Sequence, residues 1–205
     1  MKLFFAPESC ALAVHIALEE AGADYDLVRV HLDRSEQRTA AFLAMNPLGR
    51  VPVLETQQGT LTEVPAILCY VAACFPASRL IPEDPFEMAK MNAFSAFLSS
   101  TVHATFAHYA RPYRWADDEH CRRAISVKAA VTYAEQFAMI DAHWLATPWV
   151  MGDQYTVADP YLYFLTRWLR RVNCDVMGFP QVATHHRLMN ERAAVHRALA
   201  MEGLS

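Results

Sequence analysis

A proline-rich segment separates two stretches of different hydrophobic pattern in this chain. Residues 76–85 read PASRLIPEDP, which holds three prolines and shows neither helical nor strand periodicity. Such a composition is typical of a semi-rigid linker. A chain of 205 residues is long enough for two small domains. We therefore expect one domain in residues 1–75 and a second in residues 86–205.

The pattern before the linker predicts a small α/β domain. A short apolar run ends at Pro7, and a helical pattern follows it as far as Gly22. Later, two short strand patterns flank Gly59, and Pro65 opens an apolar helix. The expected strands are residues 2–6, 25–32, 51–54 and 60–62, and the expected helices are residues 12–19 and 66–75. The first two strands form a βαβ unit, which makes them parallel, and the last two form an antiparallel pair.

Only helical patterns follow the linker. The expected helices are residues 86–110, 117–146, 156–172 and 181–199. The third begins with Thr156 and Asp159, which have the spacing of a capping box. In that motif the Thr156 hydroxyl accepts from the Asp159 N–H, and the Asp159 carboxylate reaches back. This start should seat a buried helix of an all-α domain.

Composition and charge exclude several classes of function. Apolar residues make up 54% of the chain, which is enough to fill a core without disulfide bonds. Lys and Arg number 18 against 22 Asp and Glu, and no basic stripe could neutralise a phosphate backbone. The apolar stretches are too short or too polar for a signal peptide or a membrane span. We therefore expect a cytoplasmic protein that binds neither nucleic acid nor membranes.

Five cysteines, an odd number without any Cys-x-x-Cys pair, indicate reduced thiols. Cys10 stands where a strand hands over to a helix, so the helix N-terminus should lower its pKa and make it reactive. The alternative, a cysteine that acts as a small buried hydrophobe, weighs equally for Cys10. That alternative is the one we expect for Cys69, Cys74 and Cys174. No metal site is expected, because the histidines lack zinc-ligand spacing.

Three further positions could carry function. Val51-Pro52 opens a strand, where a cis bond would turn the Val51 backbone toward a ligand, although a trans edge-strand proline is the commoner arrangement. Glu63 precedes a helix start, so it could bind an ammonium group while the helix end binds a carboxylate, or it could simply cap the helix. His103 lies on a small, polar helix face that could line a cleft or a packing surface.

Taken in this order, the motifs resemble those of the glutathione transferases. The opening MKLFFAPESCALAVHIALEEAG resembles the bacterial beta class most closely. NPLGRVPVL, LTEVPAI, the linker, SSTVHATF, GDQYTVADPYLY and the closing EGL also match family landmarks, so the resemblance covers essentially the whole chain. It implies a thioredoxin-like α/β N-terminal domain, an all-α C-terminal helical bundle, a homodimer, and glutathione bound between the domains.

The resemblance also implies roles for particular residues. Cys10 would face the glutathione sulfur, and His103 would line the active-site cleft. Val51 with cis-Pro52 would pair with the cysteinyl backbone, and Glu63 would meet the γ-glutamyl group. The rest of the expected glutathione site is Val64, Arg34 and Ser35, and the expected second-substrate pocket is Tyr109, Arg111, Tyr113, Trp115 and Trp168.

Some positions depart from the family pattern. Polar groups that are common in relatives are replaced at Ala11, Val64, Ala96 and Ala104, and Arg34 or Ser35 stands where a lysine contacts the glycyl end. Two functions follow. The first is a detoxifying transferase that conjugates glutathione to small apolar electrophiles, with an added redox activity, thiol–disulfide reduction through Cys10. The alternative is a non-catalytic ligand-binding or scaffold protein with a weakened glutathione site.

Overall fold

The N-terminal half of the chain forms a four-stranded sheet. The structure is a computed structural model that describes residues 1–145 and 148–204. The strands are β1 (Lys2–Phe5), β2 (Asp26–Arg29), β3 (Val53–Thr56) and β4 (Gly59–Thr62), in the order β2-β1-β3-β4. β1 pairs in parallel with β2 and antiparallel with β3, which in turn pairs antiparallel with β4. The predicted parallel and antiparallel pairs are confirmed.

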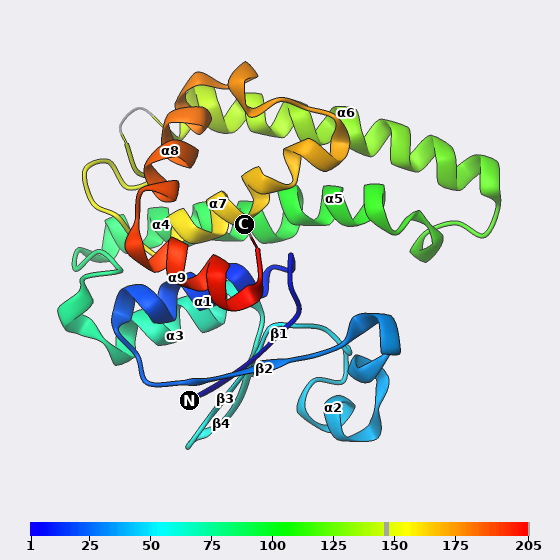
Figure 1. The fold of residues 1–205 in the computed structure, drawn as a ribbon. Coiled ribbons are helices and arrows are strands. Elements are labelled where there is room, and N and C mark those ends of the chain that lie inside the picture. The colour runs from blue at the N-terminus through cyan, green and yellow to red at the C-terminus, as the bar shows by residue number, and fades with distance from the viewer. Residues whose placement is uncertain (146–147, 205) are drawn as a thin grey trace.

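Alternating side chains of the strands divide between the two faces of this sheet. Leu3 and Phe5 point into the main core with α1 (Ala11–Ala21) and α3 (Val64–Cys74), which lie between the sheet and the helical half (Figure 1). Phe4 contacts Phe42 of the short helix α2 (Ala40–Met45), which belongs to a separate small cluster. The sheet is thus covered on both faces, as the thioredoxin-like arrangement requires.

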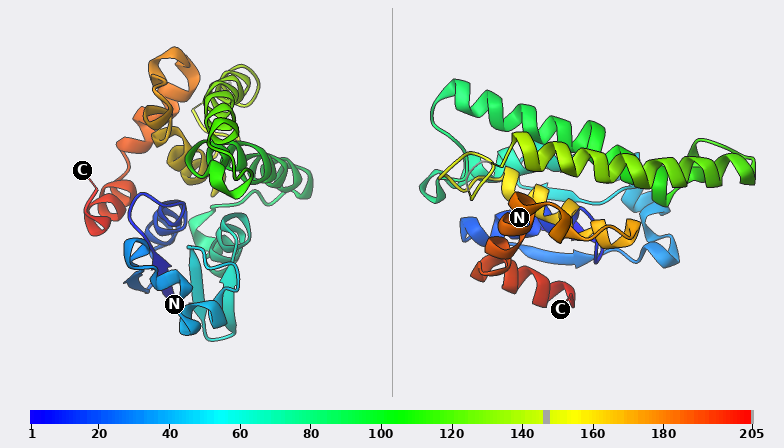
Figure 2. Two further views of the ribbon diagram at one scale, coloured as in Figure 1. Left: turned by 90° about the vertical axis from the view of Figure 1, so that its right-hand side faces the viewer. Right: turned by 90° about the horizontal axis from the view of Figure 1, so that it is seen from above.

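The C-terminal half is helical in its described residues. Its helices are α4 (Pro85–Phe97), a π-helical turn (Leu98–Val102), α5 (His103–Ala110), α6 (Glu119–His143), α7 (Ala158–Arg167), α8 (Pro180–Asn190) and α9 (Ala193–Glu202). The α4–α5 rod and α6 run side by side (Figure 2). The fold is therefore the predicted one, a thioredoxin-like domain with a helical C-terminal domain. Within the described residues, no helix is long and apolar enough to cross a membrane.

Two helix predictions need correction. The helix expected over residues 86–110 contains a π turn, where the backbone N–H of His103 donates to the Leu98 carbonyl. The helix expected over residues 181–199 is two helices, because Arg192 adopts an extended backbone between α8 and α9. At this break the guanidinium of Arg192 forms a bidentate ion pair with Glu20 of α1.

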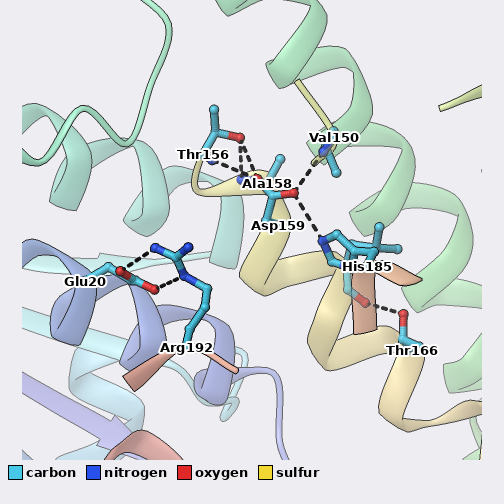
Figure 3. A network of polar contacts seen from close by, with 9 residues as sticks. Glu20, Val150, Thr156, Ala158, Asp159, Thr166, His185 and Arg192 are labelled. Carbon is cyan, nitrogen blue, oxygen red and sulfur yellow. Dashed lines mark hydrogen bonds and ion pairs between the residues drawn. The ribbon is translucent and has the colours of Figure 1, made fainter. Parts of the chain in front are cut away.

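The start of α7 is fixed by a fully buried carboxylate, that of Asp159 (Figure 3). Its Oδ2 accepts from the Thr156 backbone N–H at 2.7 Å and from the Thr156 hydroxyl at 3.3 Å, as predicted. Its Oδ1 accepts from Val150 N at 2.9 Å and binds His185 Nε2 at 3.1 Å. The Thr156 hydroxyl, however, accepts from the Ala158 N–H rather than from Asp159 N–H, so that half of the capping box is wrong. The reason is that the helix begins at Ala158.

Candidate functional site

Cys10 lies at the junction that the sequence predicts for it. It is the residue immediately before α1, and its backbone is already helical at φ −63° and ψ −8°. Its Sγ donates to the backbone carbonyl of Val51, 3.5 Å away. The thiol therefore reaches from the start of α1 to the turn before β3.

The predicted lowering of the Cys10 pKa is wrong. Burial raises the pKa of Cys10 to about 12, because the thiolate would lose its hydration. The positive charges of Arg111 and Arg50 act in the opposite direction and only partly offset this, while the carboxylate of Glu63 adds to the rise. In the unliganded protein Cys10 is consequently a neutral thiol, which can donate a hydrogen bond.

The loop opposite Cys10 holds the expected proline. The peptide bond between Val51 and Pro52 is cis, as the resemblance implies, and not trans. Pro52 is buried, whereas Val51 is only half-buried. The Asn46 side-chain amide donates to the Arg50 carbonyl at 2.8 Å and braces the loop just before this bond. The Val51 backbone therefore faces the same space as the Cys10 thiol.

Glu63 stands at the N-terminus of α3 in an unusual backbone conformation. Its φ is +68°, a left-handed value that is uncommon for a residue with a side chain. The carboxylate makes no capping hydrogen bond, so the simple capping interpretation is wrong, and the side chain is exposed. The next residue, Val64, is buried and supplies no hydroxyl. A strained residue with a free carboxylate beside unpaired helical N–H groups is an arrangement suited to a ligand with an ammonium and a carboxylate.

His103 is held against an aromatic wall of the helical domain. Its Nδ1 lies 3.1 Å from the hydroxyl of Tyr161, and its ring meets Phe164 and Trp168 edge-on. Burial, together with the smaller effect of the Arg111 and Arg50 charges, lowers the pKa of His103 to about 4. His103 is therefore neutral at physiological pH, so it acts there as an uncharged hydrogen-bonding group.

Two residues near Cys10 were missed by the sequence analysis. Burial raises the phenol pKa of Tyr161 on α7, and its nearness to Glu63 and to Cys10, when that thiol is ionised, raises it further. Arg50 lies close enough to affect both Cys10 and His103. Neither residue gives a sequence signal, because Tyr161 belongs to an apolar helix and Arg50 belongs to a turn.

The residues expected to form the second-substrate pocket do not all lie together. Trp168 is buried in the aromatic wall, and Tyr109 donates to the Arg171 carbonyl at 2.6 Å. Arg111 is half-buried just after α5, close to Cys10. Tyr113 and Trp115 are exposed on the turn that follows. Trp168 and Arg111 therefore lie beside the residues around Cys10, while Tyr113 and Trp115 lie on a rim.

The remaining predicted positions lie at the periphery. Arg34 and Ser35 are exposed on a turn after β2, and their side chains form no hydrogen bond or ion pair with any residue of the described ranges. No three His, Cys, Asp or Glu side chains converge to hold a metal ion in the part of the chain that the structure describes. A cavity of about 590 Å³ next to α7 and α8 is lined by none of the predicted site residues.

Sequence comparison gives relatives for both halves of the chain. Residues 1–73 match the family model "Glutathione S-transferase, N-terminal domain", and residues 102–193 match "Glutathione S-transferase, C-terminal domain". The glutathione S-transferase GstA of Escherichia coli O157:H7 is 33% identical over 207 residues, with 100% of each chain covered.

Solved structures agree with this assignment. A glutathione transferase homologue from Sulfitobacter with bound glutathione superposes with a TM-score of 0.95 at 36% identity, covering 100% of this chain and 98% of that one. A bacterial beta class glutathione S-transferase of Sphingomonas chungbukensis superposes with a TM-score of 0.87 at 34% identity, covering 100% of both chains.

Proposed function

Because this chain belongs to the glutathione S-transferase family and is a glutathione transferase, we propose that it conjugates glutathione to small apolar electrophiles at the site around Cys10. The observation that carries this proposal is the position of the Cys10 thiol, which lies at the start of α1 and donates to the Val51 carbonyl 3.5 Å away. A thiol whose pKa is about 12 is a donor, not a nucleophile, at neutral pH. The group best suited to accept its hydrogen bond is the thiolate of a bound glutathione.

The proposed reaction uses the chain to hold and polarise the sulfur of glutathione. The glutathione thiol loses its proton to water, and the S–H of Cys10 then turns from the Val51 carbonyl to donate to the new thiolate. The α1 N-terminus and the guanidinium of Arg111 add positive potential at the same point. The thiolate attacks the electrophilic carbon, so a C–S bond forms while the bond to the leaving group breaks.

The other glutathione groups would be held by neighbouring elements. The Val51 backbone, set by cis-Pro52, would pair with the cysteinyl unit. The free carboxylate of Glu63 would bind the γ-glutamyl ammonium, while N–H groups at the start of α3, including that of Val64, would bind its carboxylate. Arg34 or Ser35 would reach the glycyl end. The homologue with bound glutathione supports this placement by its likeness to the chain.

Three further parts of the proposal concern the whole chain. Residues 1–75 would form the glutathione-binding domain, residues 86–205 the domain that binds the electrophile, and residues 76–85 the linker. His103 would act as a neutral wall or donor of the cleft. The protein would be a homodimer, as is usual in the family.

Thiol–disulfide reduction through Cys10 is the second candidate activity. In that reaction the thiolate of Cys10 would attack a mixed disulfide of glutathione, and a second glutathione would then release it. Attack requires the ionised form, which burial disfavours in the unliganded protein. The position of Cys10 at a helix start remains the observation in its favour.

Calorimetric titration with reduced glutathione, followed by an assay with an aromatic halide, tests the proposal. We expect saturable binding at or below the millimolar range and conjugation that exceeds the uncatalysed rate. The Glu63→Gln variant should bind glutathione about tenfold more weakly, because a charge-assisted hydrogen bond is lost. Glu83→Gln, an exposed acid in the linker, is the matched control. Absence of binding and of conjugation in the wild type would favour the scaffold alternative.

A further inference from the structure

A group of arginines without carboxylate partners lies beside the site. Arg50, Arg111, Arg114 and Arg171 form no ion pair with any acid of residues 1–145 and 148–204. Elsewhere in the helical half, Arg170, Arg187 and Arg197 each contact a glutamate, whereas Arg123 and Arg167 also form no ion pair with a described acid. Unpaired guanidinium groups that crowd together repel one another, and an anion removes that repulsion.

Aromatic contacts hold Arg171 on the wall that carries His103. The guanidinium carbon of Arg171 lies 5.2 Å from the ring centre of Phe106 and 5.8 Å from that of Trp168. Trp168 in turn lies 5.3 Å from the His103 ring, measured between centroids. Arg171 therefore covers the aromatic wall whose other edge is His103.

Arg111 joins the same group from the end of α5. Its backbone N–H donates to the Ala107 carbonyl at 2.9 Å, and Arg114 N donates to the Arg111 carbonyl at 3.1 Å, which fixes the turn. Tyr109, two residues earlier, donates to the Arg171 carbonyl, so the α5 end and the segment after α7 are tied together. The charges of Arg114 and Arg171 each lower the pKa of Arg111, as burial does more strongly, so these groups are near one another.

The wall also has an excess of donors over acceptors. The indole Nε1–H of Trp168 is buried and has no acceptor among the described residues. An indole N–H and guanidinium groups can only donate. The negative group that affects Cys10 comes instead from Glu63, at the start of α3. This side of the cleft thus suits a ligand that accepts hydrogen bonds and carries negative charge.

We propose that the electrophile conjugated at this site carries a carboxylate, which Arg111 and Arg171 bind. This inference rests on the proposed conjugation and narrows its substrate class from apolar electrophiles to anionic aromatic ones. The carboxylate takes no part in the bond changes. With an aromatic chloride as the electrophile, the glutathione sulfur bonds to the ring carbon that carries the chlorine. Chloride leaves with its electron pair, and the proton of glutathione passes to water.

A matched pair of substrates tests the proposal. The anion is chlorodinitrobenzoate, with chloride para to the carboxylate and between the nitro groups, and the neutral partner is its methyl ester. Each kcat/KM is divided by the rate constant of the same compound with free glutathione, which removes the difference in intrinsic reactivity. We expect the wild type to favour the anion by about tenfold or more, as charge-assisted pairing with arginine allows.

Arginine variants locate the preference. Arg111→Met and Arg171→Met should each lower the ratio of the two normalised kcat/KM values about tenfold. Arg187→Met, an exposed arginine of α8 paired with Glu191, should leave the ratio unchanged. If a variant fails to fold, the wild type still decides, because dinitrobenzoate should compete with the substrate at concentrations about tenfold lower than its methyl ester does.

Three other results would refute an anionic substrate bound by Arg111 and Arg171, and each has a different meaning. Equal turnover of anion and ester by the wild type leaves the conjugation intact and refutes the anionic substrate. A raised KM for glutathione in the arginine variants, with an unchanged substrate ratio, assigns these arginines to a glutathione carboxylate instead. Turnover of neither compound removes the proposed conjugation and this inference with it.

Discussion

At the residue scale, Cys10 shows two effects that act in opposite directions on one thiol. The helix N-terminus and the nearby arginines favour the thiolate, whereas burial favours the thiol, and burial is the larger effect. A sequence reveals the helix start but not the depth at which the side chain lies. The position of Cys10 could therefore be predicted, whereas the direction of its pKa change could not.

Alkylation of Cys10 follows from this state. In the unliganded protein we expect Cys10 to react with iodoacetamide more slowly than Cys74 and Cys121, both of which are exposed, since little thiolate forms below a pKa of about 12. The exposure of Cys74 also corrects the expectation that it is a buried hydrophobe. Mass mapping of the alkylated sites across a range of pH measures the three rates. A Cys10 rate that titrates below the ~8.5 of a free thiol would contradict this.

The neutral state of His103 makes stability depend on pH. The pKa of its ring is about 4 in the folded protein, against ~6.5 in the unfolded chain. As the pH falls through this interval, the His103 ring binds a proton in the unfolded chain but not in the folded protein. The contribution of neutral His103 to the free energy of unfolding is therefore fully present above about pH 6.5 and is lost progressively below it. Between about pH 7 and pH 5 the loss should be about 2 kcal/mol.

Urea unfolding at the two pH values measures that loss. The His103→Gln variant, which cannot titrate, should lose about 2 kcal/mol less stability than the wild type over the same interval. His120→Gln, an exposed histidine of α6, is the control and should behave as the wild type does. Identical pH dependence in the wild type and His103→Gln would show that His103 is not neutralised by burial.

At the element scale, some helix boundaries were predictable and others were not. Strand-breaking prolines, Gly22 and the Thr156–Asp159 spacing are local signals, and the corresponding elements lie where the sequence places them. The break at Arg192 has no local signal, because neither Gly nor Pro stands between α8 and α9. Arg192 pairs at this break with Glu20, which is 172 positions away. Long-range pairing of this kind cannot be derived from periodicity.

Loss of the charge on Asp159 should destabilise the start of α7. The Asp159→Asn side chain keeps one acceptor oxygen and replaces the other with an NH₂ group. In one orientation this NH₂ group faces the donors of Thr156, and in the other it faces those of Val150 and His185. Since unsatisfied buried groups cost ~1–3 kcal/mol each, we expect a loss of about 3 kcal/mol in the free energy of unfolding. Asp175→Asn, at an exposed cap with a single backbone bond, is the control. Equal losses in the two variants, measured by urea unfolding, would refute a central role for this network.

At the scale of the whole molecule, α9 packs against α1 of the N-terminal domain. Arg192 and Arg197 pair with Glu20 and Glu19, and the fully buried His15 lies 2.9 Å from Glu202, Nδ1 to Oε1. Figure 2 shows α9 beside α1. One continuous core runs through both halves. The end of the chain therefore helps to hold the two halves on which the site is built.

Removal of the buried acid should weaken this attachment. Glu202→Ala leaves His15 Nδ1 without its acceptor, at a cost of ~1–3 kcal/mol in the free energy of unfolding. Glu191→Ala, an exposed acid with only a surface partner, should cost less than ~1 kcal/mol. The denaturation midpoints of the two variants report the difference. If Glu202→Ala is no less stable than Glu191→Ala, the buried pair contributes nothing to the attachment.

The thioredoxin-like and helical halves were predictable, because the linker and the motifs on either side are contiguous in the sequence. The approach of Cys10, Val51 and Glu63 could be expected from the family resemblance, but Tyr161, Arg111 and Arg171 come from the other half by tertiary packing. In a site built from two halves of a chain, sequence motifs predict the residues that each half contributes through a motif. They do not predict the residues that only tertiary packing brings to the site.

The ultraviolet absorbance of thiolate in the glutathione complex shows whether Cys10 donates to the bound sulfur. Reduced glutathione is added to the wild type and to Cys10→Ala, and the thiolate signal of each complex is followed as a function of pH. A protonated Cys10 that donates to the bound sulfur predicts a glutathione thiol pKa well below ~8.5 in the wild type and closer to it in Cys10→Ala. Saturable binding without any thiolate signal at neutral pH, or an identical titration in the two proteins, would contradict the account.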